Sequence, residues 1–132
     1  MGAVLDTHAI IWYLFRSKEL SATALQAIRQ AIGVGSAVYI SAISLIEIVY
    51  LVEKGRIPIE ALQKLNAALK DPASSLRIAP VDAIVAEAIQ KVSRDIVPDM
   101  PDRIIAATAL CLELPLVTCD QKIHLTNIKI IW

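Results

Sequence analysis

The chain has 132 residues, enough for one hydrophobic core, and we expect a single domain over residues 1–132. It is 56% hydrophobic, which excludes a disordered chain, and its 13 basic and 13 acidic residues cancel, so bulk charge gives no reason to bind nucleic acid. The longest apolar run, residues 37–52, contains Glu47 and is shorter than the roughly 20 residues of a membrane span. Because no secretory signal is visible, we expect a soluble cytoplasmic protein whose surplus apolar surface is buried in a homodimer or against a partner chain.

Apolar residues recur either in short unbroken runs, typical of buried strands, or at helical spacing, and the two patterns alternate along the chain. Ser21 and Asp82 are expected helix N-caps, and Gly33 and Gly55 are expected to end their helices. Strands alternating with helices indicate an α/β domain whose parallel sheet is covered on both faces. We expect strands over residues 3–5, 37–41, 76–80, 115–120 and 128–132, and helices over residues 10–14, 21–33, 42–54, 59–71, 82–93 and 102–114.

Four acidic residues map to one edge of this expected sheet. Asp6 and Asp120 end the first and fourth strands, Glu47 lies on the helix that leaves the second strand, and Asp102 lies near the start of the helix that feeds the fourth. Ligands of open parallel sheets collect at the carboxyl ends of the strands. The four carboxylates are therefore expected close together.

Each acid also has a purely structural interpretation. Asp6 could be a helix N-cap, and Glu47 could form a capping box with Ser44. Asp102 could occupy the third position of a helix that Asp99 caps, and Asp120 could begin a turn. Glu47, however, is expected on a helix with almost no solvated face, where a lone carboxylate is costly to desolvate. Four neighbouring carboxylates repel one another unless a cation neutralises them, and oxygen ligands without His or thiolate suit Mg²⁺ or Mn²⁺.

The two cysteines do not indicate a disulfide framework or a zinc site. No Cys or His spacing of the zinc-binding kind is present. Cys111 lies on an apolar helical stretch and is expected in the core. Cys119 is likewise interpreted as structural.

At the four acids the sequence resembles a PIN domain, specifically the VapC-type toxins of bacterial and archaeal toxin–antitoxin pairs. The resemblance covers essentially the whole chain and rests on four blocks in order, "LDTHAIIWYL", "SAISLIEIVYLVEKGRI", "PDMPDRIIAATAL" and "PLVTCDQKI". It implies a three-layer α/β/α sandwich with a central parallel sheet. It also implies a metal-dependent endoribonuclease with Mg²⁺ or Mn²⁺ as cofactor, RNA as substrate and a cognate antitoxin as partner.

The resemblance also assigns roles to individual residues. Those matching the acidic metal-binding and catalytic quartet are Asp6, Glu47, Asp102 and Asp120. Asp99 and Thr118 match positions where relatives often carry an acid and a hydroxyl, and Thr7 is expected beside them. Candidate contacts to the RNA backbone are Arg103, foremost, and then Lys122, Lys54 and Arg56. Water would attack the phosphodiester in line and leave 5′-phosphate and 3′-hydroxyl ends.

Two other acid-bearing α/β folds fit less well. A phosphatase of the haloacid dehalogenase type needs a second Asp where this chain has His8, and a response-regulator receiver needs an acidic pair ahead of its strand-end Asp. Two alternatives within the PIN fold stay open. One is an interaction protein that does not cleave nucleic acid, although the intact acidic quartet argues against it. The other is a nuclease that acts in RNA maturation or on DNA.

Overall fold

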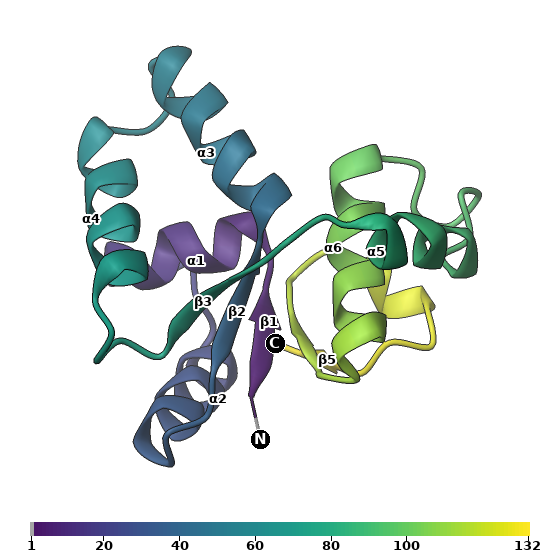
Figure 1. Ribbon diagram of the computed structural model, residues 1–132, viewed down its shortest axis with the longest axis horizontal. Coiled ribbons are helices and arrows are strands. Elements are labelled where there is room, and N and C mark those ends of the chain that lie inside the picture. Colours follow the sequence, from purple (N-terminus) through teal and green to yellow (C-terminus); the bar gives the residue numbers. More distant parts are fainter. Residues whose placement is uncertain (1) are drawn as a thin grey trace.

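The computed structural model describes residues 2–132 and contains a five-stranded sheet in which every neighbouring pair of strands is parallel (Figure 1). The spatial order is β3-β2-β1-β4-β5, with Leu5 of β1 opposite Ile40 of β2 and Val117 of β4. This confirms the parallel sheet predicted from the sequence. The strands are β1 (Ala3–Leu5), β2 (Val38–Ser41), β3 (Leu76–Ala79), β4 (Leu116–Val117) and β5 (Ile130–Ile131).

Within residues 2–132, six helices and two short 3₁₀ turns cover the sheet. Residues of α1 to α4 pack together on one of its faces, and residues of α5 and α6 pack on the other, which confirms the three-layer α/β/α sandwich. No helix within residues 2–132 combines the length and apolar character that crossing a bilayer requires. The helices are α1 (Thr7–Leu14), α2 (Ala22–Gly33), α3 (Ala42–Glu53), α4 (Ile59–Lys70), α5 (Ala83–Ala88) and α6 (Met100–Leu112), and the 3₁₀ turns are η1 (Ile89–Lys91) and η2 (Ile123–Leu125).

The predicted helix caps are confirmed at four helices, including α1, whose N-cap is Asp6, and corrected at one. Ser21 and Asp82 accept hydrogen bonds from backbone N–H groups of α2 and α5, each at 3.0 Å, and Asp99 caps α6 in the same way. Helix α3, by contrast, is capped by Ser41, whose hydroxyl oxygen accepts the Ile43 N–H at 3.2 Å. Ser44 is therefore not an N-cap, and the capping-box interpretation of Glu47 is wrong.

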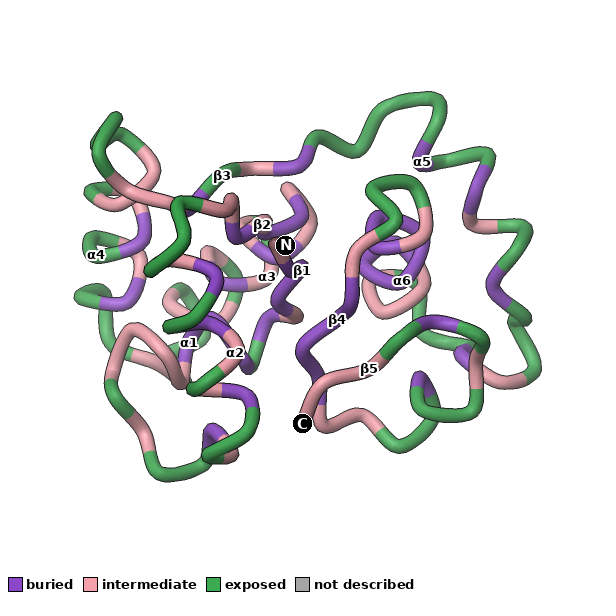
Figure 2. The backbone as a smooth tube through the Cα atoms, turned by 90° about the horizontal axis from the view of Figure 1, so that it is seen from below, coloured by how far each residue is buried: buried purple, intermediate pink, exposed green. Residues whose placement is uncertain are grey.

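The sheet separates two hydrophobic cores because successive residues of a strand point to opposite faces. Leu5 of β1 packs among α1 to α4 with fully buried partners such as Ile28 and Ile48. Val4 packs on the other face with α6 residues such as Ile105. Each fully buried Leu or Ile contributes about 1.5–3 kcal/mol to folding. Figure 2 shows buried backbone running through β1, β4 and much of α6, in the middle of the molecule.

Two expectations about burial are wrong. Cys111 is exposed near the end of α6, so it does not pack in the core. Helix α3, for which almost no solvated face was expected, exposes 52% of Ile46 and 58% of Tyr50. Both errors have one cause, because apolar periodicity predicts which residues share a helix face but not whether another element covers that face.

Candidate active site

The predicted acids lie where the order of the sheet reverses, between β1 and β4. Asp6 directly follows β1 and Asp120 follows β4 shortly after its last residue, while Glu47 and Asp102 come from α3 and α6. In Figure 1 both helices begin near the end of β1, at one edge of the sheet. The charge of Asp120 raises the pKa of both Asp6 and Asp102, and Glu47 also raises that of Asp102. The fold therefore brings all four carboxylates into one neighbourhood.

Asp6 is the N-cap that the sequence predicted, and it also lies near another acid of the quartet, Asp120. Its Oδ1 accepts the Ala9 N–H at 2.9 Å, so it is the N-cap of α1. Burial raises its pKa above the ordinary value, against the opposing effects of hydrogen bonds from Thr118 and Ala9 and of His8. A half-buried carboxylate held by two donors is rigid, and its remaining oxygen lone pairs are free to face the other acids.

Thr7 and Ser44 form a buried hydrogen-bond chain that ends on Glu47. The Thr7 hydroxyl donates to Oε1 of Glu47 at 2.6 Å. The Thr7 Oγ1 also lies 2.9 Å from Oγ of Ser44, and because Thr7 has only one hydroxyl hydrogen, Ser44 is the donor in this second hydrogen bond. Thr7 is nearly buried and Ser44 is fully buried, whereas Glu47 is half-buried. Sequence reasoning placed Thr7 near the site but missed Ser44, whose three-residue spacing from Glu47 was read as a capping box.

Asp102 is the acid that the other carboxylates affect most. Burial, followed by the charges of Asp99, Asp120 and Glu47, raises the pKa of Asp102 from 3.8 to about 7. Its backbone N–H donates to Oδ2 of Asp99 at 3.3 Å, which confirms Asp99 as the helix cap. A side-chain hydrogen bond joins Asp102 to Asp120, and it favours the protonated form of Asp102. Near neutral pH a substantial fraction of the Asp102 carboxyl is therefore protonated.

Thr118 connects Asp6 with Asp120. It is fully buried, its hydroxyl hydrogen-bonds to Asp6, and its Oγ1 accepts the Asp120 N–H at 3.0 Å. The carboxylate of Asp120 accepts the Lys122 N–H at 2.9 Å, which is the turn predicted there. His124, to which the sequence assigned no role, lies with Nε2 3.1 Å from the Thr118 carbonyl oxygen and so tethers η2 to the end of β4.

Arg103 has a different role from the predicted one. Its Nε and Nη2 donate to the Val92 carbonyl at 3.2 and 2.9 Å, and Nη2 also donates to the Ile89 carbonyl at 3.0 Å. Arg103 therefore fastens the η1 turn to the start of α6 instead of presenting its guanidinium to a substrate. The other predicted cations, Lys54, Arg56 and Lys122, are exposed and stay candidates for phosphate contacts.

Cys119 lies beside the acids but does not supply a thiolate. Burial, and then the charge of Asp6, raises the pKa of its thiol above 9.0, so the thiol stays protonated near neutral pH. This agrees with its structural interpretation and leaves carboxylates as the reactive groups of the site.

The donor set fits a hard divalent cation. All four side chains offer only carboxylate oxygens, which Mg²⁺ and Mn²⁺ prefer. Across residues 2–132 no three His, Cys, Asp or Glu side chains converge closely enough to hold one ion together. Asp102 and Asp120 are joined by a side-chain hydrogen bond, and Mg²⁺ is usually held by one or two carboxylates together with waters and substrate phosphates. A pair of carboxylates of this kind is therefore sufficient to hold Mg²⁺ or Mn²⁺.

Comparison with known proteins decides the family. The family model described as the PIN domain matches residues 3–129. The chain belongs to the PIN domain family. PIN domains are typically nucleases that use divalent metals, which agrees with the carboxylate chemistry described above. No curated protein matches the sequence significantly.

Solved structures with the same fold include components of toxin–antitoxin complexes. VapBC2 from Rickettsia felis, bound to a DNA fragment from its promoter, matches with a TM-score of 0.72 at 19% identity, over 98% of this chain and 97% of that one. A toxin–antitoxin complex from Klebsiella pneumoniae matches with a TM-score of 0.68 at 24% identity, over 98% and 96%. FitAcB from Neisseria gonorrhoeae matches with a TM-score of 0.61 at 23% identity, over 97% and 95%. At these identities the likeness shows that the PIN fold is shared.

Proposed function

We propose that this PIN domain is a Mg²⁺- or Mn²⁺-dependent endoribonuclease and the toxin component of a toxin–antitoxin pair. The observation that carries the nuclease proposal is the gathering of carboxylates where the order of the sheet reverses, where burial and then the charges of Asp99, Asp120 and Glu47 raise the pKa of Asp102 to about 7. Such crowding opposes folding, and strongly perturbed carboxylates at a strand-end site are typical of catalysis. The PIN family match supports the same activity.

The residues divide into cation ligands and groups that hold them in position. Asp102 and Asp120 are the proposed pair that holds a cation, and Asp6 and Glu47, the other two acids of the quartet, join them or act on water. Thr118 holds Asp6, and Thr7 holds Glu47 through the 2.6 Å hydrogen bond. A bound Mg²⁺ or Mn²⁺ would polarise the phosphoryl oxygen and make water a stronger nucleophile for in-line attack on RNA.

The toxin assignment rests on the structural neighbours and on the exposed apolar surface. The neighbours described above are toxin–antitoxin complexes, and their PIN fold covers nearly all of this chain. Exposed apolar residues outside α3 and α6, among them Val34, Ile84 and Leu125, would be buried by a cognate antitoxin or a second copy. We therefore propose an antitoxin partner, a homodimer and a cytoplasmic location, where RNA is accessible.

Cleavage of RNA by the purified protein tests the nuclease proposal. We expect a panel of structured and unstructured RNAs to contain a substrate that is cut in the presence of Mg²⁺ or Mn²⁺, and EDTA to stop the reaction. Asp6→Asn keeps the cap of α1, because Asn is as good an N-cap as Asp, but removes the charge and should abolish cleavage. The matched control is Asp71→Asn, since Asp71 accepts a backbone N–H at the far end of α4 in the same way. Cleavage that persists in EDTA, or full activity in Asp6→Asn, contradicts the proposal.

Growth of a bacterial host tests the toxin assignment. Induction of the wild-type chain should arrest growth, and Asp6→Asn should not. Co-expression of the small protein encoded in the adjacent reading frame should restore growth and copurify with this chain. Unimpaired growth under strong expression of the folded wild-type protein would argue for a nuclease outside a toxin–antitoxin pair.

A further inference from the structure

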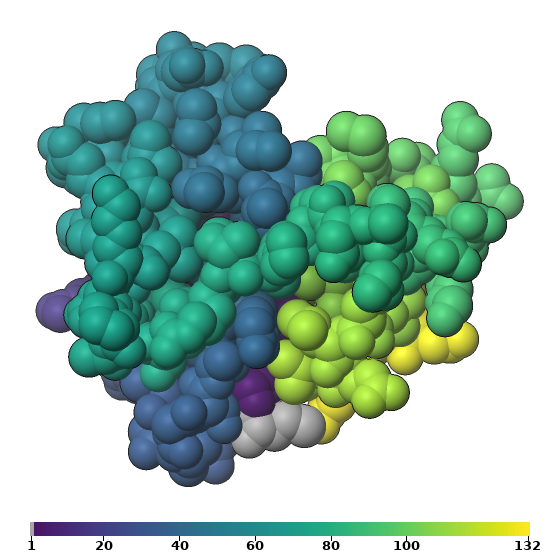
Figure 3. Space-filling model, viewed as in Figure 1, coloured from purple at the N-terminus to yellow at the C-terminus, as the bar shows by residue number. Residues whose placement is uncertain are grey.

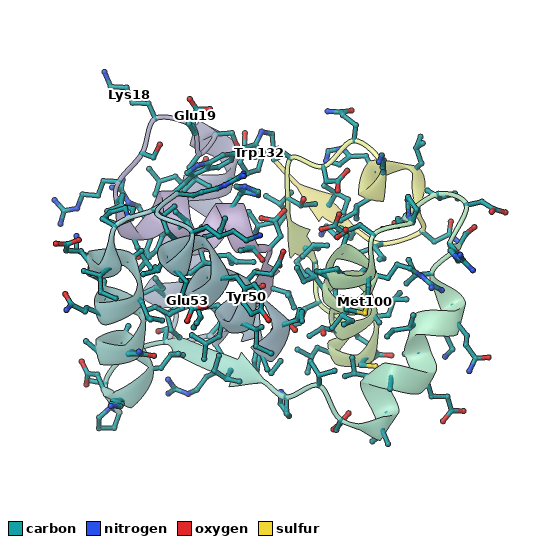
Figure 4. All side chains as sticks on the ribbon, turned by 90° about the horizontal axis from the view of Figure 1, so that it is seen from above. Lys18, Glu19, Tyr50, Glu53, Met100 and Trp132 are labelled. Atoms are coloured by element: carbon teal, nitrogen blue, oxygen red, sulfur yellow. The ribbon has the colours of Figure 1, made fainter. Side chains whose placement is uncertain are left out.

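A cleft of about 460 Å³ opens between α3 and the start of α6, directly beside the acids. Its apolar walls are Ile43, Ile46 and Tyr50 from α3 and Met100 and Pro101 from α6, and we call it the apolar cleft. In Figure 3 a notch separates α3, at the top of the molecule, from the start of α6. Figure 4 shows Tyr50 and Met100 on the two helices that face each other across this region.

The walls of the apolar cleft include three large, well-exposed apolar side chains. Ile46, Tyr50 and Met100 are 52%, 58% and 65% exposed, and they line one cleft instead of lying singly over the surface. Contiguous exposed apolar patches on proteins mark binding sites. The volume also falls in the range of about 300–1,000 Å³ typical of small-molecule pockets.

The apolar cleft is continuous with the proposed catalytic site. Thr7 and Glu47 line it, and these two are joined by the hydrogen bond that fixes the Glu47 carboxylate. A nucleic-acid strand with a phosphate at the acids therefore places a neighbouring nucleotide at the cleft. Lys54 also lines the cleft and supplies a positive charge for a phosphate of that strand.

The chemistry of the lining suits one part of a nucleotide. Aromatic and apolar side chains bind the flat faces of unpaired bases, whereas paired bases in a duplex have those faces covered by their neighbours. Tyr50 provides an exposed aromatic ring, and His8, also exposed, provides a second flat ring in the lining. The other half of the lining, Ile43, Ile46, Leu51, Met100 and Pro101, has no hydrogen-bonding side chain and offers apolar contact to the flat face of a base.

We propose that the apolar cleft binds one unpaired nucleobase of the substrate strand, next to the bond that is cut, with Tyr50 stacking on that base. This inference rests on the proposed ribonuclease function and deepens it. It makes Tyr50 a specificity-determining residue and restricts cleavage to single-stranded RNA. Purines, which have the larger stacking face, should be favoured at the bound position.

Photo-cross-linking tests the contact without requiring cleavage. Short single-stranded RNAs that carry 5-iodouridine at varied positions are irradiated with the full-length protein in EDTA, and cross-linked peptides are mapped by mass spectrometry. We expect the main cross-link at Tyr50, with a second at His8. RNA that cross-links only elsewhere, or a failure to cross-link at all, overturns the proposal whether or not the protein is a nuclease.

Cleavage kinetics test whether stacking of a base on Tyr50 contributes to RNA cleavage. Tyr50→Ala, at an exposed helical position that tolerates Ala, should lower kcat/KM on single-stranded RNA by about 5-fold to 150-fold, and Tyr50→Phe should restore most of it. An abasic nucleotide at one position beside the cut should impair the wild type by a similar factor but have little further effect in Tyr50→Ala. The control is Ile84→Ala, which removes an apolar side chain that is 70% exposed on α5.

The outcomes separate this inference from the proposed function. Cleavage that is indifferent to Tyr50→Ala and to abasic positions overturns the base subsite and leaves the nuclease intact. Cross-linking at Tyr50 without cleavage supports the subsite and contradicts the nuclease. If RNA does not cross-link at Tyr50 and Tyr50→Ala weakens only the binding of the antitoxin, the cleft is a protein-docking surface and the proposal is wrong.

Discussion

Asp102→Asn should stabilise the metal-free fold while it abolishes cleavage. In the folded chain, burial and then the charges of Asp99, Asp120 and Glu47 raise the pKa of Asp102 from 3.8 to about 7. Between these two values the folded state binds more protons than the unfolded state. The free energy of unfolding therefore falls as the pH rises through this window, and the loss is complete above the folded pKa. Asn carries no charge and removes this penalty.

The expected stabilisation by Asp102→Asn follows from the shift in the pKa of Asp102. A difference of about 3 pKa units corresponds to about 4 kcal/mol if nothing screens the charges. Asp102 is only half-buried, and because water screens its neighbours we expect about 1–2 kcal/mol. With an unfolding entropy of about 2.1 cal/mol/K per residue, each kcal/mol raises Tm by about 4 °C in a chain of 132 residues.

Thermal unfolding in EDTA, followed by circular dichroism at several pH values, measures this difference. At about pH 8 the Asp102→Asn variant should melt about 4–8 °C above the wild type, and the gap should close as the pH falls towards about 4. Asp71→Asn, at an exposed site away from the acids, should show no such dependence on pH. If the gap between Asp102→Asn and the wild type is independent of pH, or if the variant is less stable at about pH 8, the crowding of carboxylates around Asp102 is refuted.

Three further substitutions test other contacts of the site and the fold. Thr7→Val removes the hydroxyl that fixes Glu47 and should lower kcat/KM by about 10-fold to 150-fold, measured on the same RNA, while Thr7→Ser should retain activity. Arg103→Gln loses the guanidinium bonds to two carbonyls and should lower the free energy of unfolding by about 1–3 kcal/mol in urea titrations, with RNA affinity unchanged. Cys111→Ser should change stability by less than about 0.5 kcal/mol, since Cys111 is exposed, and a larger loss would restore the core interpretation.

The architecture could be predicted because its signals are local. Caps such as Ser21 and Asp82, and short apolar runs such as residues 3–5, depend only on neighbouring residues. The meeting of distant acids could be predicted from topology alone, because the carboxyl ends of parallel strands share an edge. Asp6 and Asp120 therefore follow adjacent strands of the sheet although they are far apart in the chain.

The errors concern contacts between elements that are distant in sequence. Arg103 follows a catalytic candidate, but its guanidinium reaches back to carbonyls of η1, which no spacing rule indicates. Ser44 has the spacing of a capping box, yet its partner is Thr7 from another helix. Whether an apolar helix face such as that of Tyr50 is covered depends on the packing of other elements. Such contacts become visible only when the chain is folded.

The four acids are not equivalent, because the fold anchors three of them more firmly than the fourth. Backbone N–H groups or hydroxyls donate to the carboxylates of Asp6, Glu47 and Asp120. Asp102 instead hydrogen-bonds to another acid, and each further charge that acts on it is also a carboxylate. A nearby cation lowers the pKa of such a group. The charge state of Asp102 therefore depends on whether a cation is bound, so cation binding should be tightest above pH 7 and weaken as Asp102 takes up its proton.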